Sequence, residues 1–295
     1  MSAPIIHTGD AYILRTCAAD MTSRGGFVWP REGNVAAPDW AATASCGAGL
    51  HGFLWGEGDG WLAYWGPDAV WVVARVEQWV DLGGKVKFPE AEAVFAGSRS
   101  EATDRIIALG ARGAVIGCTR IGGYGSTLTG GARSTLTGGG GSTLTGGDGS
   151  TLTGGDGSTL TGGYGSTLTG GARSTLTGGG GSTLTGGDGS TLTGGERSTL
   201  TGGARSTLTG GGGSTLTGGD YCTLTGGDYS TLTGGDGSTL TGGDGSTLTG
   251  GYGSTLTAKW FDGNRHRIVV AYVGEDGIEP GVAYRVVNGK FKATK

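Results

Sequence analysis

The sequence predicts a mainly β protein whose central part is a β-solenoid, and three observations lead to this fold class. The tetrad Ser-Thr-Leu-Thr recurs every eight residues from Ser126 to Ser254, with Cys222 once in place of Ser. Thr-Leu-Thr favours a strand with alternating faces, and the Gly-Gly-x-x segment after it favours the positive φ angles of a tight corner. Each octad therefore predicts one short strand and one turn, whereas a disordered glycine-rich linker would not keep Leu at every eighth position.

The octads predict a parallel β-helix with two octads, or 16 residues, in each coil. Segment 124–257 would then form about eight coils. A coil of three strands and 24 residues remains a second possibility. In either case one Leu from each octad points inward and forms a thin core ladder. This ladder begins with Leu128, Leu136, Leu144 and Leu152.

The two threonines of each octad point away from that core and form a regular outer surface. Neighbouring threonines would lie ~6.7 Å apart along a strand and ~4.8 Å apart between coils. Such a lattice of hydroxyls and methyls could order water, although Thr is also simply a residue that tolerates an exposed strand face. The first water-facing or ice-facing candidates are Thr127, Thr129, Thr135, Thr137, Thr143, Thr145, Thr151 and Thr153.

Composition limits the classes of function. Gly contributes 70 of the 295 residues and charged residues only 16%, which argues against an ordinary globular enzyme of this length. The six prolines and the absence of a G-X-Y period exclude collagen. Segment 124–257 carries eight acidic and four basic residues, so nucleic acid is not an expected partner. No apolar stretch is long enough to span a membrane.

The segments outside the array predict four regions in all. Residues 1–110 form a small Trp-rich α+β head domain, residues 111–123 a lead-in coil, residues 124–257 the solenoid of 17 octads, and residues 258–295 a short β cap. In the head we expect strands at 11–16, 61–65 and 70–80, and a helix at 99–109 capped by Ser98 or Ser100. In the cap, turns are expected at Asp262-Gly263, Asp276-Gly277 and Asn288-Gly289.

The head contains the few candidates for site chemistry. Cys46 and His51 could form a nucleophile–base pair, but a buried structural Cys and a hydrogen-bonded His are the preferred interpretation. The Trp cluster is most simply the core, with an aromatic recognition surface as the alternative. Three His and four scattered Cys lack metal-ligand spacing, and stacked Asp220 and Asp236 could hold a cation only weakly. No cofactor or metal is therefore expected. No secretory leader is visible in residues 1–10, which leaves a cytoplasmic, phage-associated or surface-associated location open.

Two motifs resemble a known family. The octads Tyr124-Gly-Ser-Thr-Leu-Thr and Ala132-Arg-Ser-Thr-Leu-Thr, together with segment 260–279, are similar to bacterial ice nucleation proteins. The resemblance implies a solenoid that orders water and self-associates. It also implies assembly roles for a set of array and cap residues: Tyr124, Tyr164, Arg133, Arg173, Arg197, Arg205 and Trp260. This sequence departs from the family in lacking a Tyr in every coil, and a two-octad coil would place Tyr124 and Tyr164 on opposite edges.

The head resembles a different group of proteins. Segments 20–27 and 46–53 are similar to an N-terminal domain found ahead of repeat arrays in phage and bacterial proteins, which implies the architecture, and a phage origin, but no reaction. We therefore expect a non-catalytic, self-associating structural protein whose partners are its own copies and ordered water or ice. The alternatives are a binding or host-interaction module, in which the solenoid is a rigid spacer for the head, and an enzyme with a catalytic head.

Overall fold

The computed structural model describes residues 5–23 and 25–294. Within these residues the chain is mainly β, and it divides into two compact units. The first unit contains residues up to Arg120 together with Thr129–Thr135, and the second contains Ile121–Leu128 and Leu136–Lys295. Part of segment 1–10, in which a leader was sought, and Arg24 of segment 20–27 lie outside the described residues.

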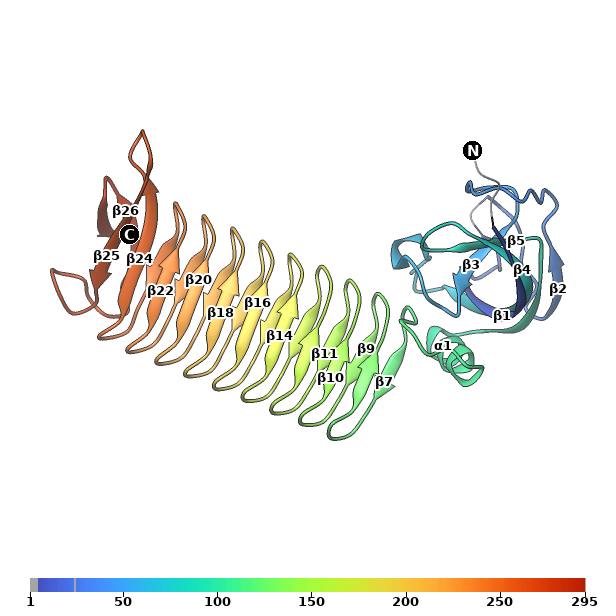
Figure 1. The fold of residues 1–295 in the computed structure, drawn as a ribbon, viewed down its shortest axis with the longest axis horizontal. Helices are drawn as coiled ribbons and strands as arrows, with labels where there is room; N and C mark the ends of the chain where they lie inside the picture. The colour runs from blue at the N-terminus through green and yellow to red at the C-terminus, as the bar shows by residue number, and fades with distance from the viewer. Residues whose placement is uncertain (1–4, 24, 295) are drawn as a thin grey trace. The chain divides into compact units, whose positions relative to one another are not determined.

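The first unit is built on a six-stranded antiparallel sheet with the strand order β1-β3-β5-β4-β6-β2 (Figure 1). Its strands are β1 (Ile6–Cys17), β2 (Gly33–Ala36), β3 (Leu50–Leu54), β4 (Val70–Asp81), β5 (Val86–Phe88) and β6 (Glu90–Gly97). The strands predicted at 11–16 and 70–80 are confirmed, and they pair with each other from Ala11↔Val76 to Cys17↔Val70. Ile13 and Val72 are fully buried between the sheet and the rest of the unit.

The predicted helix at 99–109 is confirmed as α1 (Arg99–Ala108). Ser98 is its N-cap: the hydroxyl of Ser98 accepts from the backbone N–H of Glu101, and the Glu101 carboxylate accepts from the backbone N–H of Ser98. This capping box satisfies two of the backbone donors that a helix start leaves free. Ala102 and Ile106 are fully buried on one face of α1, which anchors the helix to the core.

The prediction of a strand at 61–65 is wrong. This segment begins with a short 3-10 helix, η1 (Gly60–Leu62), whose N-cap is Asp59. The Asp59 carboxylate accepts a hydrogen bond from the backbone N–H of Trp61 at 3.0 Å. Asp favours such turn geometry by bonding to the backbone two residues further on, and this local bond competes with strand pairing.

The interpretation of the Trp cluster as simply the core is only partly right. Trp29 and Trp71 are buried at 2% exposure, but Trp61 is 68% exposed. Trp65 is half-buried and lies edge-on to Trp71, with their ring centroids 5.2 Å apart. The cluster therefore runs from the core to the surface of the unit.

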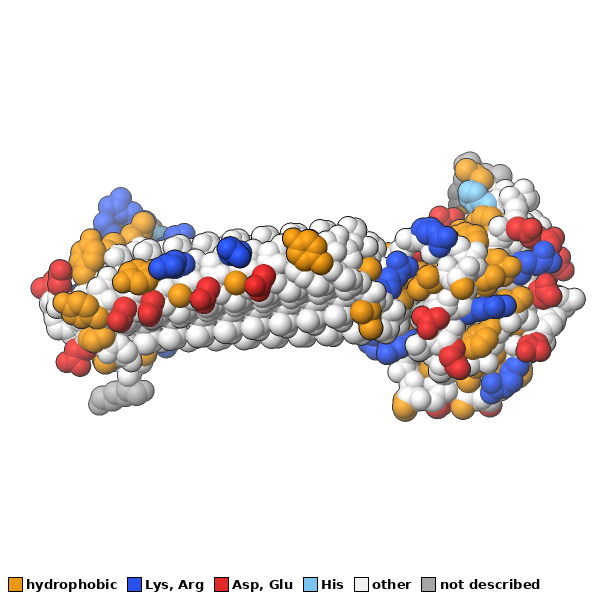
Figure 2. All heavy atoms as spheres, turned by 90° about the horizontal axis from the view of Figure 1, so that it is seen from below, with side chains coloured by type: hydrophobic (Ala, Val, Ile, Leu, Met, Phe, Trp, Pro, Cys, Tyr) orange, Lys and Arg blue, Asp and Glu red, His pale blue; other side chains and the backbone are white. Residues whose placement is uncertain are grey.

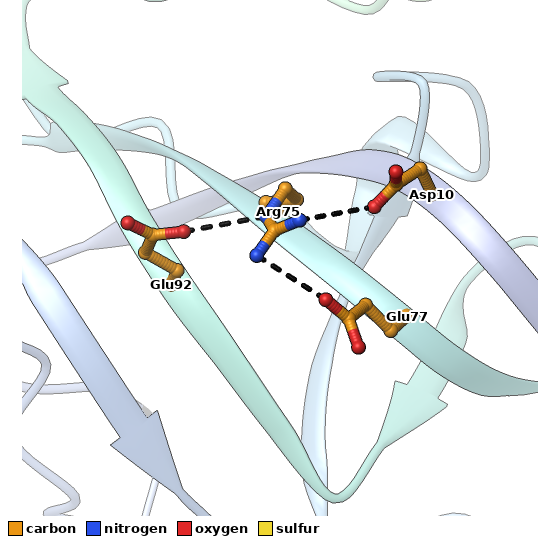
Figure 3. A network of polar contacts seen from close by, with 4 residues as sticks. All are labelled: Asp10, Arg75, Glu77 and Glu92. Carbon is orange, nitrogen blue, oxygen red and sulfur yellow. Dashed lines mark hydrogen bonds and ion pairs between the residues drawn. The ribbon is translucent and has the colours of Figure 1, made fainter.

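A surface ion network joins three parts of the head sheet (Figure 3). Arg75 on β4 contacts Asp10 on β1 at 3.1 Å, Glu77 on its own strand at 3.2 Å, and Glu92 on β6 at 3.3 Å. All four side chains are well exposed to water. Because solvent screens exposed ion pairs, this network adds little stability and mainly fixes the geometry of the strand surface.

The second unit contains the repeat array, in which alternate octads contribute to two parallel sheets (Figure 1). Leu144 pairs with Leu160 in one sheet and Leu152 with Leu168 in the other, so each strand pairs with the strand two octads further along the chain. The two-octad coil is therefore confirmed, and the three-octad coil is excluded. The first sheet contains β8 (Thr127–Thr129), β10 (Thr143–Thr145), β12 (Thr159–Thr161), β14 (Thr175–Gly178), β16 (Thr191–Gly194), β18 (Thr207–Gly210), β20 (Thr223–Gly226), β22 (Thr239–Gly242) and β24 (Thr255–Phe261).

The other sheet begins with the lead-in strand that the sequence places in phase with the octads. Its parallel strands are β7 (Thr119–Ile121), β9 (Thr135–Thr137), β11 (Thr151–Thr153), β13 (Thr167–Thr169), β15 (Thr183–Thr185), β17 (Thr199–Thr201), β19 (Thr215–Thr217), β21 (Thr231–Thr233) and β23 (Thr247–Thr249). The pairings within the array keep one register from coil to coil. Each face is therefore a regular grid.

The corners have the positive φ angles expected of the Gly-Gly-x-x segment. Within it the second variable residue adopts them, as at Gly157 (φ +67°) and Arg173 (φ +55°). The Gly-Gly pair itself is required by space. A Cβ on Gly170 would lie 2.6 Å from the Ser174 Cβ of the same corner, and one on Gly171 would lie 2.0 Å from the Asp156 Oδ1 of the adjacent coil. The second glycine of the pair thus lets neighbouring coils approach, while Arg tolerates the left-handed position at a cost.

The C-terminal segment ends both sheets with antiparallel strands. Strand β25 (His266–Tyr272) pairs with β24, and β26 (Ala283–Val287) pairs with β23 and with β27 (Lys290–Ala293). The turn predicted at Asn288-Gly289 joins β26 to β27, and both residues have positive φ, 51° and 74°, as a two-residue hairpin turn requires. The parallel stacking of coils therefore stops at the cap.

Candidate functional site

The two faces of the array expose Thr and bury Leu. The Leu ladder is at 0% exposure from Leu136 to Leu256. Leu128 is half-buried, because β8 is the last strand of its sheet and has a neighbour on one side only. Burying a Leu side chain contributes ~1.5–3 kcal/mol, so every octad adds a comparable increment to the stability of the array.

The candidate threonines lie on these two faces in ordered files. Thr127, Thr135, Thr137, Thr143, Thr145, Thr151 and Thr153 are exposed, and Thr129 is half-buried. Thr143 pairs with Thr159 and Thr145 with Thr161, so that hydroxyls stack directly from coil to coil. With a strand separation of ~4.8 Å and a two-residue repeat of ~6.7 Å, each face offers a grid of alternating hydroxyls and methyls. Because backbone bonds fix every strand, the grid is rigid before any ligand arrives.

The Ser of most octads lies inside the coil and braces the corners, whereas the hydroxyls of Ser126 and Ser142 have no hydrogen-bond partner among the described residues. Ser174 is 1% exposed, and its hydroxyl donates to the carbonyl of Gly171 at 2.8 Å, within its own corner. The Ser190 hydroxyl donates to the carbonyl of Gly171 at 3.2 Å, 19 residues earlier. A buried hydroxyl without a partner would be destabilising, so these bonds let a polar residue stand beside the Leu core.

Aspartates at the corners link one coil to the next. The Oδ1 atom of Asp148 accepts the backbone N–H of Tyr164 at 2.8 Å, and that of Asp188 accepts the N–H of Ala204 at 2.9 Å. Asp220 accepts the N–H of Asp236 in the same way at 3.0 Å. One carboxylate oxygen of Asp220, a residue considered for a weak cation site with Asp236, is thus used in a hydrogen bond within the protein. The described residues contain no group of three or more His, Cys, Asp or Glu placed to hold a metal ion.

The corners form two edges, here named the Asp156 edge and the Asp148 edge. Figure 2 shows acidic and basic side chains spaced along one edge beside the uncharged faces. Because the corners of one edge recur at every second octad, Tyr124 and Tyr164 fall on opposite edges, as the two-octad coil requires. The Asp156 edge carries Tyr124, Asp156, Arg173, Asp188, Arg205, Asp220, Tyr221, Asp236 and Tyr252. The Asp148 edge carries Arg133, Asp148, Tyr164, Glu196, Arg197, Asp228, Tyr229 and Asp244.

The candidate assembly residues have unlike environments. Tyr124 and Tyr164 are 88% and 63% exposed. The Arg133 guanidinium lies 4.8 Å from the Trp65 ring centroid and 6.0 Å from that of Trp61, all within the first unit. Trp260 is half-buried and packs over the hairpin turn of the cap, where a Cβ on Gly289 would lie 2.8 Å from its ring. Like Arg133, the other corner arginines occupy left-handed positions: Arg173, Arg197 and Arg205.

In the head, the interpretation of Cys46 as buried and His51 as hydrogen-bonded is wrong. Cys46 is exposed, and its thiol accepts a hydrogen bond from Lys85 Nζ at 3.0 Å. The buried Nε2 atom of His51 has no hydrogen-bond partner. Burial and the charges of Lys85, Arg15 and Lys87 lower the pKa of His51 to about 4, so its imidazole is neutral near pH 7. The sequence offers no signal for Lys85, because it lies 39 residues from Cys46.

Several ice nucleation proteins resemble part of the chain. A 99-residue segment is 40% identical to an ice nucleation protein of Xanthomonas campestris pv. translucens, covering 32% of this chain and 6% of that protein. A 113-residue segment is 39% identical to ice nucleation protein InaU of Pantoea ananas, covering 37% of this chain and 11% of that protein. These matches lie over the repeat region. The array is an ice nucleation protein-like repeat.

This assignment concerns the repeat and not the whole chain. A third relative, an ice nucleation protein of Pseudomonas fluorescens, is 42% identical over 94 residues, which is 30% of this chain and 8% of that protein. The chain thus spans about a tenth or less of the length of these relatives. No family model and no solved structure matches the chain. Among the described residues, no helix has the length and apolarity needed to cross a membrane.

Proposed function

We propose that the protein is a non-catalytic structural protein whose ice nucleation protein-like array orders water on its threonine faces and works as a self-associated assembly. The observation that carries the proposal is the in-register grid of exposed Thr over a fully buried Leu ladder. A rigid grid of hydroxyls and methyls can hold water in fixed positions without first losing conformational entropy of its own.

Self-association is part of the proposal because the array is short. Each face offers only eight or nine parallel strands, so one molecule presents a small area to water. The edges supply groups that can join copies side by side, namely acidic and basic side chains with exposed Tyr. Opposite charges on facing edges would favour contact and give it a salt dependence.

The test is a droplet-freezing assay combined with size-exclusion chromatography and light scattering on the same sample. In the test variant, every outward Thr of β12, β14, β16 and β18 becomes Val, which keeps the β-branched shape and removes the hydroxyl. We expect the freezing temperature of the variant to fall toward that of buffer. The control variant Glu77→Gln/Glu92→Gln changes two exposed side chains of the head, leaves both faces and both edges of the array intact, and should freeze like the wild type.

Two results would contradict the proposal. One is wild-type protein that forms high-mass particles and still freezes at the temperature of the buffer control. The other is a Thr→Val variant with unchanged freezing at matched particle mass. If the wild type raises the freezing temperature but this effect does not depend on particle mass, only the self-association part of the proposal is overturned.

A further inference from the structure

The head contains an open cavity that the proposed function of the array does not use. Its volume is about 860 Å³, which is within the range that holds small-molecule ligands. Cys46, His51 and Lys85 line one part of it, Arg15 lies among them, and Phe53 and Leu62 add apolar surface. Both parts of the chain that build it, the segment around Cys46 and the strands beside it, belong to the first compact unit.

A buried lysine fixes the loop that presents Cys46. Lys87 is 0% exposed, and its Nζ donates to the Thr43 hydroxyl at 2.9 Å, to the Ser45 carbonyl at 2.9 Å and to the Gly47 carbonyl at 3.3 Å. Ser45 and Gly47 flank Cys46 in the chain. These bonds satisfy the buried ammonium and hold the backbone on both sides of Cys46.

The thiol itself is set up as a nucleophile. Lys85 Nζ lies 3.0 Å from the Cys46 Sγ, and this contact holds the pKa of Cys46 below its usual value. The thiolate is the reactive form of Cys. Cys17, Cys118 and Cys222 are buried, and burial raises the pKa of each of these thiols. Cys46 is therefore the one thiol of the described chain that is both exposed and activated.

The cavity also carries an excess of positive charge. No carboxylate is among its lining residues, and within the described part of the chain Arg15, Lys85 and Lys87 form no ion pair with Asp or Glu. Arg15 stacks over Trp29 at 5.0 Å and donates to the His51 carbonyl. Asp20 acts on Cys17, and Asp39 acts on His51 and Lys87, only through longer-range fields. Because His51 is neutral, the net field in the cavity favours an anion.

We propose that this cavity binds a small disulfide that carries carboxylates, and that Cys46 exchanges with it to form a mixed disulfide. The Cys46 thiolate attacks one sulfur of the ligand, a new S–S bond forms to Cys46, and the S–S bond of the ligand breaks. The second sulfur leaves as a thiolate and takes a proton from water. The disulfide supplies the oxidising equivalents, so no further reactant is needed.

The test follows the mass of the intact, reduced full-length chain during reaction with three two-carbon disulfides. Dithiodiglycolate is anionic, hydroxyethyl disulfide is neutral and cystamine is cationic. Each rate is divided by the rate for a short cysteine peptide, because the leaving thiols differ in pKa. We expect one adduct, located at Cys46 by peptide mapping, and a normalised rate about tenfold or more higher for dithiodiglycolate than for cystamine, with the difference shrinking in high salt.

Variants distinguish the contribution of the cavity charge from that of the Cys46 thiol. Cys46→Ser should remove the adduct. Lys85→Met keeps the aliphatic stem and should lower both the rate and the preference for the anion, whereas the remote Lys290→Met should change neither. Near-UV circular dichroism of the Trp-rich head shows whether each variant is folded. Equal normalised rates for the three disulfides, a preference for cystamine, or an adduct on another Cys of the folded chain would each overturn the proposal.

Discussion

The carboxylate of Asp156 accepts a hydrogen bond from the backbone N–H of Ala172, 2.8 Å away and one full coil further along the array. The acceptor is the side chain of a residue at a variable position, and the donor is the backbone of the corresponding corner. A carboxylate bound to a backbone N–H makes a charge-assisted hydrogen bond. Asp at this position therefore connects successive corners on one edge.

The first prediction concerns this corner bond. Asp156→Ala should leave the Ala172 N–H without its acceptor and raise the exchange rate of that amide about 5–10-fold, which corresponds to a loss of ~1 kcal/mol. Asp156→Asn keeps an oxygen at the same place and should exchange nearly as slowly as the wild type. Hydrogen exchange read by mass spectrometry measures both. Equal exchange in Asp156→Ala and the wild type would show that the bond does not protect the corner.

The second prediction distinguishes the two kinds of corner glycine. In Gly171→Ala the new Cβ would lie 2.0 Å from the Asp156 Oδ1, so the coils must separate. In Gly157→Ala the Cβ meets nothing within 4 Å, and only the left-handed φ of +67° costs ~1–2 kcal/mol. Limited proteolysis should therefore cut Gly171→Ala within the array and leave Gly157→Ala intact. Similar resistance of both variants would contradict the steric explanation.

The third prediction concerns the core ladder. Leu192 is fully buried, whereas Leu128 is half-buried at the end of its sheet. Leu192→Ala should lower the free energy of unfolding of the surrounding coils by ~2–5 kcal/mol, and Leu128→Ala should lower it by clearly less. Hydrogen exchange of the central coils gives the local value, since long repeat arrays need not unfold in one step. A larger loss in Leu128→Ala than in Leu192→Ala would show that the buried Leu ladder does not determine the stability of the array.

The fourth prediction concerns pH and the head. The pKa of His51 is about 4 in the folded chain, against an ordinary value of 6.5. Between these values the unfolded chain binds the proton and the folded chain does not, so stability is full above pH 6.5 and declines as the pH falls toward 4. Because the ring is only half-buried, solvent limits the loss to ~1–2 kcal/mol. Urea unfolding followed by Trp fluorescence should show this slope in the wild type.

His51→Gln provides the control for this slope. Carboxylates also titrate in the lower part of this range, so the difference between wild type and variant is the quantity to compare. The part of the pH dependence between about 6.5 and 5 should be absent from the variant. If the two curves run parallel, the histidine is not the group responsible.

The fifth prediction separates Arg133 from the other corner arginines. Arg133 and Arg173 have the same left-handed φ of 55°, which glycine adopts without strain. Arg173→Gly should raise stability by ~0.5–1 kcal/mol, because the left-handed strain that it relieves exceeds the conformational entropy that Gly loses on folding. In Arg133→Gly the loss of the contacts with Trp65 and Trp61, worth ~0.5–1 kcal/mol, should cancel this gain and change the Trp emission. Thermal melts and emission spectra measure both effects, and an unchanged spectrum in Arg133→Gly would contradict the stacking.

The repeat itself could be predicted from the sequence, because its period carries the necessary information. The octad spacing together with the alternation of Thr and Leu determines which side chain is buried, and Leu144↔Leu160 shows the expected step of two octads. Helix α1 was also predictable, because its capping residues, Ser98 and Glu101, lie close together in the chain. These features depend on local chemistry and on repetition.

The features that the sequence did not reveal depend on neighbours far along the chain. The need for Gly171 arises from Asp156 in the adjacent coil, and not from its own φ angle. The exposure of Cys46 depends on Lys87, 40 residues or more from the oxygens it binds in the loop. Trp61 was expected in a strand, but the hydrogen bond from its backbone N–H to the Asp59 carboxylate starts a 3-10 helix there. Spacing in the sequence cannot show such contacts.

The two-octad coil also governs how the array can change in length. The cap pairs β25 with β24 on one sheet and β26 with β23 on the other. These strands are the last two octads before the cap, so the cap keeps its partners whatever the number of octads, but a single added octad would exchange the sheets that β25 and β26 join. The variable residues from Tyr124 to Asp156 recur five octads later, almost unchanged, from Tyr164 to Glu196. Because five is odd, the second copy of each side chain lies on the opposite edge. The parity of an inserted segment therefore decides on which edge every downstream corner residue lies.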